Sequence, residues 1–144
     1  MKTKKTDPQL TGMAGEFLTV GKLFKKGYQA SVTFGNAKSI DVLVYNPEID
    51  KTFIVQVKTL RKKNCFPIKK ENIKSDHIYV FVILNDFENK EEFYIVSGQE
   101  ILADINHFFG SSYQRESGPS SMPAINYGPL TKGTYLNNWK LFEK

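Results

Sequence analysis

Three polar side chains interrupt two neighbouring apolar stretches and could together hold a cation and a water molecule. Asp41 lies in the stretch SIDVLVY, and Gln56 and Lys58 lie in the stretch TFIVQVK. A carboxylate and an amide oxygen suit Mg²⁺, which keeps several of its own waters and so needs few protein ligands. A lysine beside them could orient or deprotonate a water, or stabilise charge on a phosphate. This chemistry would suit hydrolysis of a phosphodiester bond.

The two stretches are predicted to form a β-hairpin, because a turn-forming segment separates them. If Asn46 pairs with Lys51 across the loop, Asp41 lies opposite Gln56, and opposed residues share a face. Side chains alternate along a strand, so Lys58 shares this face too. A register shift of one residue would move the apolar set to the wrong face. The opposite face is expected to be core, and its residues are Ile40, Val42, Val44, Phe53, Val55 and Val57.

This pattern resembles the PD-(D/E)XK nuclease superfamily, in which an Asp on one hairpin strand precedes Glu-x-Lys on the next and an earlier helix often adds a Glu. Asp41 and the run Gln56-Val57-Lys58 match the motif, and Glu16 is the corresponding helix residue. The segment GNAKSID before the hairpin is similar to the approach loop of restriction-like and resolvase-like members. The motif core covers residues 8–60.

The resemblance implies a Mg²⁺-dependent endodeoxyribonuclease that cleaves DNA, with Mn²⁺ as a substitute metal. It implies that Asp41, Gln56, Glu16 and the backbone carbonyl of Val57 hold the metal, and that Lys58 assists the attacking water. In this chain an uncharged Gln56 takes the place of the acidic residue, and an amide holds a divalent cation less tightly than a carboxylate does.

Two positions of the motif depart from the family or have a second interpretation. Ile40 stands where the pattern has a proline. Glu16 lies on the flank of the apolar stripe of its helix, so it is either a solvated residue or a further carboxylate directed toward Asp41. Gly12 and Gly15 bracket it and would let the helix approach another backbone closely.

The elements that must position these residues follow from local patterns. Asp7-Pro8 predicts the start of a helix that ends at Gly27. Its apolar stripe, expected to pack on the core, consists of Leu10, Met13, Phe17, Val20 and Phe24. Strands are predicted at 28–34, 39–45, 52–58, 77–84 and 92–96, helices at 97–109 and 136–142, a polar basic connection at 60–76, and an irregular loop at 110–133.

These elements predict the α/β class. We expect a restriction-endonuclease-like mixed β-sheet core, of order α-β-β-β-β-α, with helices on its faces. The 144 residues form one domain of ordinary size, spanning residues 1–144.

Composition excludes several kinds of site. The one cysteine, Cys65, excludes an intramolecular disulfide and a cysteine-based zinc site, and His77 and His107 are too far apart for a His-rich metal motif. No stretch reaches the roughly 18 apolar residues of a membrane span. The basic start of the chain is not followed by an apolar run, so we expect a cytoplasmic protein with no membrane partner and no organic cofactor.

The net charge is +5, and much of the excess lies between residues 60 and 76. A concentrated basic segment suits binding to a polyanion, although a solvated loop would have the same composition. The residues expected to contact nucleic acid are Lys38, Ser39, Arg61, Lys62, Lys63, Lys69 and Lys70. A domain this small is expected to act as a homodimer when it cuts two strands.

Two other functions fit the same sequence. The first is a catalytically inactive nucleic-acid-binding module of the same fold. The second is an interaction or immunity protein unrelated to nucleic acid. Metal binding that disappears in Asp41→Ala separates the enzyme from the first, and the absence of salt-dependent DNA binding favours the second.

Overall fold

The computed structural model describes residues 7–33, 41–110 and 123–144. Its strands are β1 (Gln29–Val32), β2 (Val42–Asn46), β3 (Lys51–Leu60), β4 (Phe66–Pro67), β5 (His77–Ile83), β6 (Glu92–Ser97) and β7 (Ala124–Ile125). Its helices are α1 (Pro8–Lys25), α2 (Gly98–Ala103), α3 (Ile105–Phe109) and α4 (Tyr127–Thr131), with 3₁₀ helices η1 (Lys70–Asn72) and η3 (Trp139–Glu143). No helix in these three ranges has the length and apolar character needed to cross a membrane.

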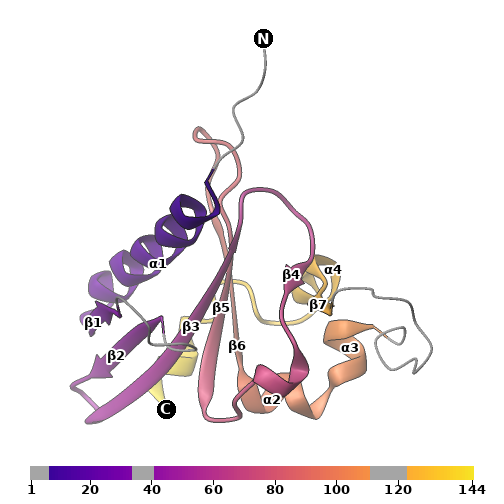
Figure 1. The fold of residues 1–144 in the computed structure, drawn as a ribbon. Helices are drawn as coiled ribbons and strands as arrows, with labels where there is room; N and C mark the ends of the chain where they lie inside the picture. The colour runs from indigo at the N-terminus through magenta and orange to yellow at the C-terminus, as the bar shows by residue number, and fades with distance from the viewer. Residues whose placement is uncertain (1–6, 34–40, 111–122) are drawn as a thin grey trace.

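The expected α/β class and the mixed sheet are confirmed. The main sheet has the order β1-β2-β3-β5-β6, and β3 and β5 are parallel while the other neighbours are antiparallel (Figure 1). Its five strands correspond to the five predicted strand segments, although the predicted order α-β-β-β-β-α counted only four. A second sheet consists of β4 and β7.

Two apolar cores lie on the two faces of the main sheet. One core joins α1 and η3 to the sheet, and the other joins α2, α3 and α4 to its opposite face (Figure 1). All residues of β5 are buried, and they alternate between the cores, with Val80 in the first and Tyr79 and Phe81 in the second. The prediction of a central strand buried on both faces is therefore confirmed.

The predicted register of the hairpin is confirmed for the five pairs from Asn46–Lys51 to Val42–Val55, but the ladder ends before the predicted pair of Asp41 with Gln56. Asn46 lies opposite Lys51, and the pairing continues to Val42 opposite Val55. The residues of its expected apolar face that the structure describes, Val42, Val44, Phe53, Val55 and Val57, are all buried in the core beneath α1. Ile40 lies outside the described residues.

The start and end of α1 are as predicted, but its expected core stripe is wrong. The Asp7 carboxylate accepts a hydrogen bond from the Gln9 N–H at 2.9 Å, and Gly27 adopts a φ of +91° after the last turn. Of the stripe, only Val20 is buried. Four residues are 37% to 58% exposed, and these are Leu10, Met13, Phe17 and Phe24.

The buried face of α1 is offset from that stripe and carries small residues. It consists of Gly15, Thr19, Val20 and Leu23. A Cβ added at Gly15 would lie 1.8 Å from Oγ1 of Thr59, so the helix lies nearly in contact with β3 at this point. Close approach of a helix to a sheet requires a residue without a side chain, and apolar periodicity does not reveal this requirement.

The predicted connection 60–76 and loop 110–133 both contain ordered structure. Within the first, β4 and η1 place Phe66, Ile68 and Ile73 in the second core. Within the second, β7 pairs with β4, and Ile125 and Leu130 are buried. A few isolated apolar side chains anchor these segments, and they are too sparse to form a periodic pattern.

Two helix predictions also need correction. The helix predicted from Ser97 to Phe109 is divided at Asp104, whose φ of −143° interrupts it between α2 and α3. The closing helix is a 3₁₀ helix that begins only at Trp139. The cap at Ser97 is as predicted, since its hydroxyl accepts a hydrogen bond from the Glu100 N–H at 3.1 Å.

The close approach at Gly15 can be tested with a matched pair of substitutions. Gly15→Ala places a methyl group against Thr59, so we expect it to destabilise the protein by about 2 kcal/mol. Gly12→Ala meets nothing within 4 Å, so we expect it to stabilise α1 by up to about 1 kcal/mol. Urea unfolding of both variants measures the difference, and Thr59→Ala should recover part of the loss in the first. Equal stability of the two variants would contradict the close approach.

Candidate functional site

The candidate site lies where β2 and β3 separate. β2 begins at Val42, whereas β3 continues to Leu60 and pairs with β5 from Ile54 onward. Among the described residues, no strand pairs with the end of β3 on its β2 side. We call this separation of the two strands the fork.

Asp41 is hydrogen-bonded to the backbone of β3 at the fork. Its N–H donates to the carbonyl of Val55 at 3.2 Å, and its Oδ2 accepts from the N–H of Val57 at 2.8 Å. The N–H and C=O groups of one strand residue point to the same side, so the Val57 carbonyl points toward the Asp41 side of β3. The Thr33 N–H donates to the Asp41 carbonyl at 3.0 Å, which ties the fork to the end of β1. The carboxylate of Asp41 and the carbonyl of Val57 therefore lie at one strand edge.

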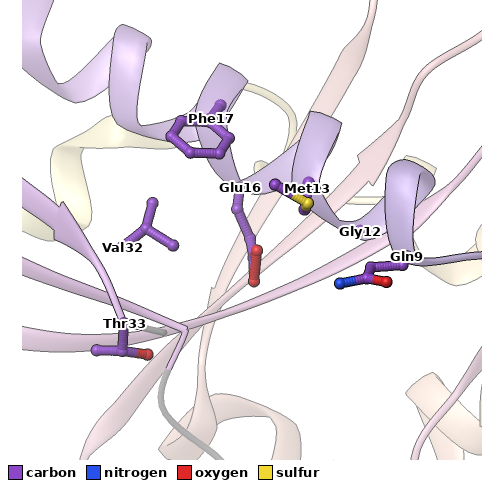
Figure 2. A pocket seen from close by; sticks show the side chains of 7 residues that line it. All are labelled: Gln9, Gly12, Met13, Glu16, Phe17, Val32 and Thr33. Atoms are coloured by element: carbon purple, nitrogen blue, oxygen red, sulfur yellow. The ribbon is translucent and has the colours of Figure 1, made fainter. Parts of the chain in front are cut away.

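Glu16 enters the site from α1. Figure 2 shows its side chain pointing from the helix toward the strands, within a hollow whose wall includes Gly12 and Thr33. Burial raises the pKa of Glu16 above its usual value, the Asp41 carboxylate raises it further, and the Lys58 ammonium lowers it. The charges of Asp41 and Lys58 thus act directly on Glu16, so the three groups share one electrostatic neighbourhood.

Gln56 and Lys58 lie on the same face of β3, as the alternation predicted. They line a second hollow together with Lys69 and Asn72. Gln56 is only 3% exposed, and its Nε2 lies 3.0 Å from Nδ1 of His77. Lys58 connects the hollow of Gln56 with Glu16, because it lines this hollow and its charge also lowers the pKa of Glu16.

The candidate donors around the fork are oxygen atoms. They are the carboxylates of Glu16 and Asp41 and the carbonyl of Val57, while the amide of Gln56 belongs to the neighbouring hollow that it shares with Lys58. Within residues 7–33, 41–110 and 123–144, no three or more His, Cys, Asp and Glu side chains form a group that could hold a metal ion. One or two carboxylates with neutral oxygens suit Mg²⁺, which retains much of its hydration shell. The residues present therefore fit a hard cation.

The basic residues expected to contact nucleic acid fall into separate groups. Lys69 lines the hollow of Gln56 and Lys58, and Lys70 lies next to it in η1. Lys62 and Lys63 line a different hollow, beyond the end of β3. The predicted basic connection therefore reaches the fork through only part of its length. Lys38 and Ser39 lie outside the described residues.

Two of the basic residues have contacts within the protein. The Arg61 Nε–H donates to Oγ1 of Thr11 at 2.8 Å, which connects the end of β3 to α1. The Lys63 ammonium lies 5.5 Å from the ring centre of Tyr127. Contact with DNA would therefore have to be compatible with these internal contacts or replace them.

Sequence reasoning missed His77 and Tyr79, which contact Gln56 from β5. The parallel pairing places Tyr79 opposite Gln56, and His77 two pairs earlier on the same face. The available signal was the spacing of His and Tyr by two residues in the otherwise apolar run HIYVFVIL. That spacing gives a buried strand one polar face at its beginning.

Comparison with known proteins supports the fold. No protein-family model matches the chain, and no curated protein sequence matches it significantly. The structure is similar to that of a bacterial homing endonuclease, I-Ssp6803I, with a TM-score of 0.52 and 15% sequence identity. The match covers 69% of this chain and 71% of that chain. The chain thus has a nuclease-like α/β fold.

Proposed function

We propose that this protein is a metal-dependent DNA endonuclease of the PD-(D/E)XK type, in which Gln-x-Lys replaces the acidic motif. The observation that carries the proposal is the fork itself, where the Val57 N–H fixes the Asp41 carboxylate at the strand edge and Glu16 points from α1 toward the strands. The effect of Asp41 and Lys58 on the pKa of Glu16 supports it. The similarity of the fold to a homing endonuclease supports the same reaction class. A likeness of fold alone would not select a function.

Each residue of the fork has a role in the proposed reaction. Glu16, Asp41, Gln56 and the carbonyl of Val57 hold Mg²⁺ or Mn²⁺, which when bound neutralises the phosphate and makes a bound water more acidic. Lys58 orients the attacking water and stabilises negative charge on the phosphate. The hydrogen bond from Val57 to Asp41 fixes the direction of the carboxylate before any ligand arrives.

DNA is the proposed substrate, and a homodimer is the proposed form for cutting both strands of a duplex. Lys69 lies in the hollow of Gln56 and Lys58, where a phosphate near the fork would meet its charge. Two copies related by a two-fold axis would present two forks to the two antiparallel strands.

The proposal is tested by cleavage of supercoiled, linear, single-stranded and four-way-junction DNA with Mg²⁺ or Mn²⁺. We expect Asp41→Asn and Lys58→Ala each to reduce the cleavage rate by about 100-fold or more, the range of metal-ligand and acid–base contributions. Asp41→Asn keeps an oxygen that can accept from Val57, so the loss would arise from the charge rather than from unfolding.

Matched controls lie far from the fork. Asp50→Asn makes the same chemical change in the loop of the same hairpin, where a φ of 49° is compatible with Asn. Lys25→Ala removes an exposed lysine in the last turn of α1. Both should cleave like the wild type. If the wild-type protein cleaves none of the substrates but binds DNA, the inactive binding module is correct; if it neither cleaves nor binds, the interaction protein is favoured.

Lys69 provides a test of the proposed phosphate contact. We expect Lys69→Ala to weaken DNA binding and to reduce the slope of log K against log salt concentration by about 0.9, the value for one phosphate contact. Fluorescence anisotropy over a series of salt concentrations measures this slope. Lys140→Ala removes an exposed lysine from η3, on the opposite face of the sheet, and should leave the slope unchanged. Equal effects of the two substitutions would contradict a specific contact at Lys69.

The raised pKa of Glu16 predicts a pH-dependent stability. Because its pKa in the folded protein lies above its ordinary value of 4.5, this carboxyl destabilises the fold as the pH rises through and above that range. We expect Glu16→Gln to stabilise the metal-free protein at pH 7 by about 0.5 kcal/mol, the scale of a partly exposed site. The gain should disappear below pH 4.5.

Chemical unfolding across this pH range, in the presence of a chelator, measures the effect. Glu48→Gln changes an exposed carboxylate in the loop between β2 and β3 and serves as the control. Indistinguishable pH profiles for the two variants would show that Glu16 does not experience the charges of the fork.

A further inference from the structure

The two ends of the Gln56 amide are chemically different, whereas the two oxygens of a carboxylate are equivalent. The amide oxygen accepts hydrogen bonds and can bind a cation, and the NH₂ group only donates. A Glu at this position would present an oxygen in either rotamer of its last torsion. A Gln presents one only if the surroundings fix its orientation, and Gln56 is buried among groups that can do so.

Tyr79 contacts the Gln56 amide on one side. Its hydroxyl oxygen accepts from the Lys74 N–H at 2.8 Å, and its proton is directed to the carbonyl of Asn72 at 3.4 Å. The oxygen can therefore only accept from Gln56, whose Nε2 lies 3.4 Å away. An amide oxygen in that place would face another oxygen with no proton between them.

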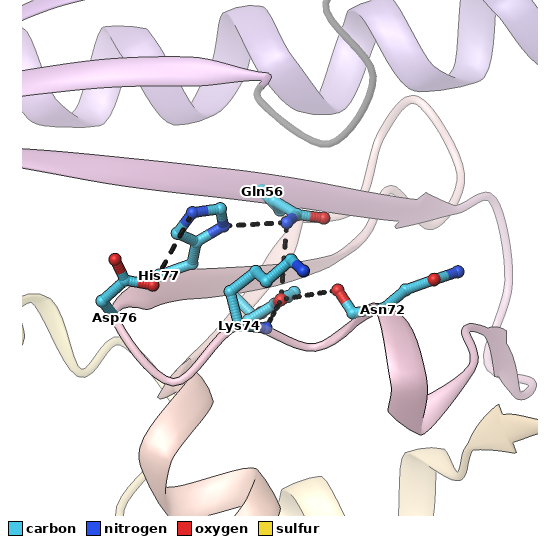
Figure 3. A network of polar contacts seen from close by, with 6 residues as sticks. Gln56, Asn72, Lys74, Asp76 and His77 are labelled. Atoms are coloured by element: carbon cyan, nitrogen blue, oxygen red, sulfur yellow. Dashed lines mark hydrogen bonds and ion pairs between the residues drawn. The ribbon is translucent and has the colours of Figure 1, made fainter.

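His77 contacts the Gln56 amide on the other side. Its Nδ1 lies 3.0 Å from Nε2 of Gln56, and its Nε2 lies 3.9 Å from the Asp76 carboxylate. The carboxylate favours the tautomer with the proton on Nε2, which leaves Nδ1 as an acceptor. His77 and Tyr79 therefore both require the NH₂ group, and Figure 3 shows the amide oxygen of Gln56 pointing away from His77.

We propose that His77 and Tyr79 are positioning residues that hold the Gln56 amide in one orientation, with its oxygen directed toward the metal-binding side of the fork. This inference rests on the proposed function and explains how an uncharged residue serves where the motif has an acid. The neutral amide lacks the negative charge that a carboxylate would bring to the cation. The two hydrogen-bond acceptors on β5 fix the orientation of the amide, which a carboxylate does not need because its two oxygens are equivalent.

The orientation is tested without metal by NMR. In ¹⁵N-labelled wild-type protein, we expect a scalar coupling across the hydrogen bond between the Gln56 NH₂ nitrogen and Nδ1 of His77, and a His77 ring protonated at Nε2. His77→Phe keeps a ring in the buried position and removes the acceptor. A His77 ring protonated at Nδ1, or the absence of the coupling, would overturn this inference and leave the proposed function standing.

The consequence of the orientation is tested with Mn²⁺ alone, by calorimetric titration of four proteins. These are the wild type, His77→Phe, Gln56→Glu and the double variant. We expect His77→Phe to weaken Mn²⁺ binding about 10- to 100-fold when Gln56 is present, the effect of removing a support of a metal ligand. In the Gln56→Glu background the same substitution should change the affinity little, because either carboxylate oxygen can face the metal.

The pattern across the four proteins decides between the interpretations. Equal losses in both backgrounds would show that His77 acts through general packing and would overturn the orienting role. Thermal unfolding of each variant confirms that it is folded at the temperature of the titration. Failure of the wild-type protein to bind Mn²⁺ would instead overturn the proposed metal site, and with it the need for an oriented amide.

Discussion

A strand that extends beyond its neighbour leaves backbone groups without a partner in the sheet, and β3 does so beside β2. Buried or half-buried N–H groups must be satisfied in some other way. Here the Asp41 carboxylate accepts from the Val57 N–H at 2.8 Å, just beyond the last described pair of the β2–β3 ladder. The residue that satisfies the backbone is thus also the acid of the candidate site. Its position is set by its hydrogen bonds to the backbone of Val55 and Val57.

The contact between α1 and β3 brings Glu16, the second carboxylate of the candidate site, to the fork. The same contact destabilises the protein locally. Glu16 reaches the fork because its neighbour Gly15 lies against Thr59. The hydroxyl of Thr59 is buried and has no hydrogen-bond partner among the described residues. Leaving such a group unsatisfied costs about 1–3 kcal/mol. The same orientation of α1 leaves Phe17 exposed on the outer side of the helix. These features are understandable if the position of Glu16, rather than maximal burial, determines how the helix lies.

The sequence predicted the hairpin site well because each step depended on local geometry. The loop fixes the pairing from Asn46–Lys51 to Val42–Val55, and alternation places Gln56 and Lys58 on one face of β3. Asp41 lies beyond the last pair and is held by the backbone of Val55 and Val57. The face of α1 could not be predicted in this way, because it depends on a close contact with a strand distant in sequence. His77 was missed for a related reason: β5 pairs with β3 in parallel, and its register depends on the whole connection between them rather than on a short turn.

The environment of Gln56 bears on whether the site is a working one. From the sequence alone, the replacement of an acid by an amide indicates a weaker metal site. In the structure, the buried amide lies between Nδ1 of His77 and the hydroxyl of Tyr79 in a core that is otherwise largely apolar. A fold with no use for this amide would lose little by an apolar side chain of the same volume, provided that the acceptors on β5 were replaced as well. The paired polar groups of Gln56, His77 and Tyr79 are therefore better explained by the proposed orienting role than by the stability of the core.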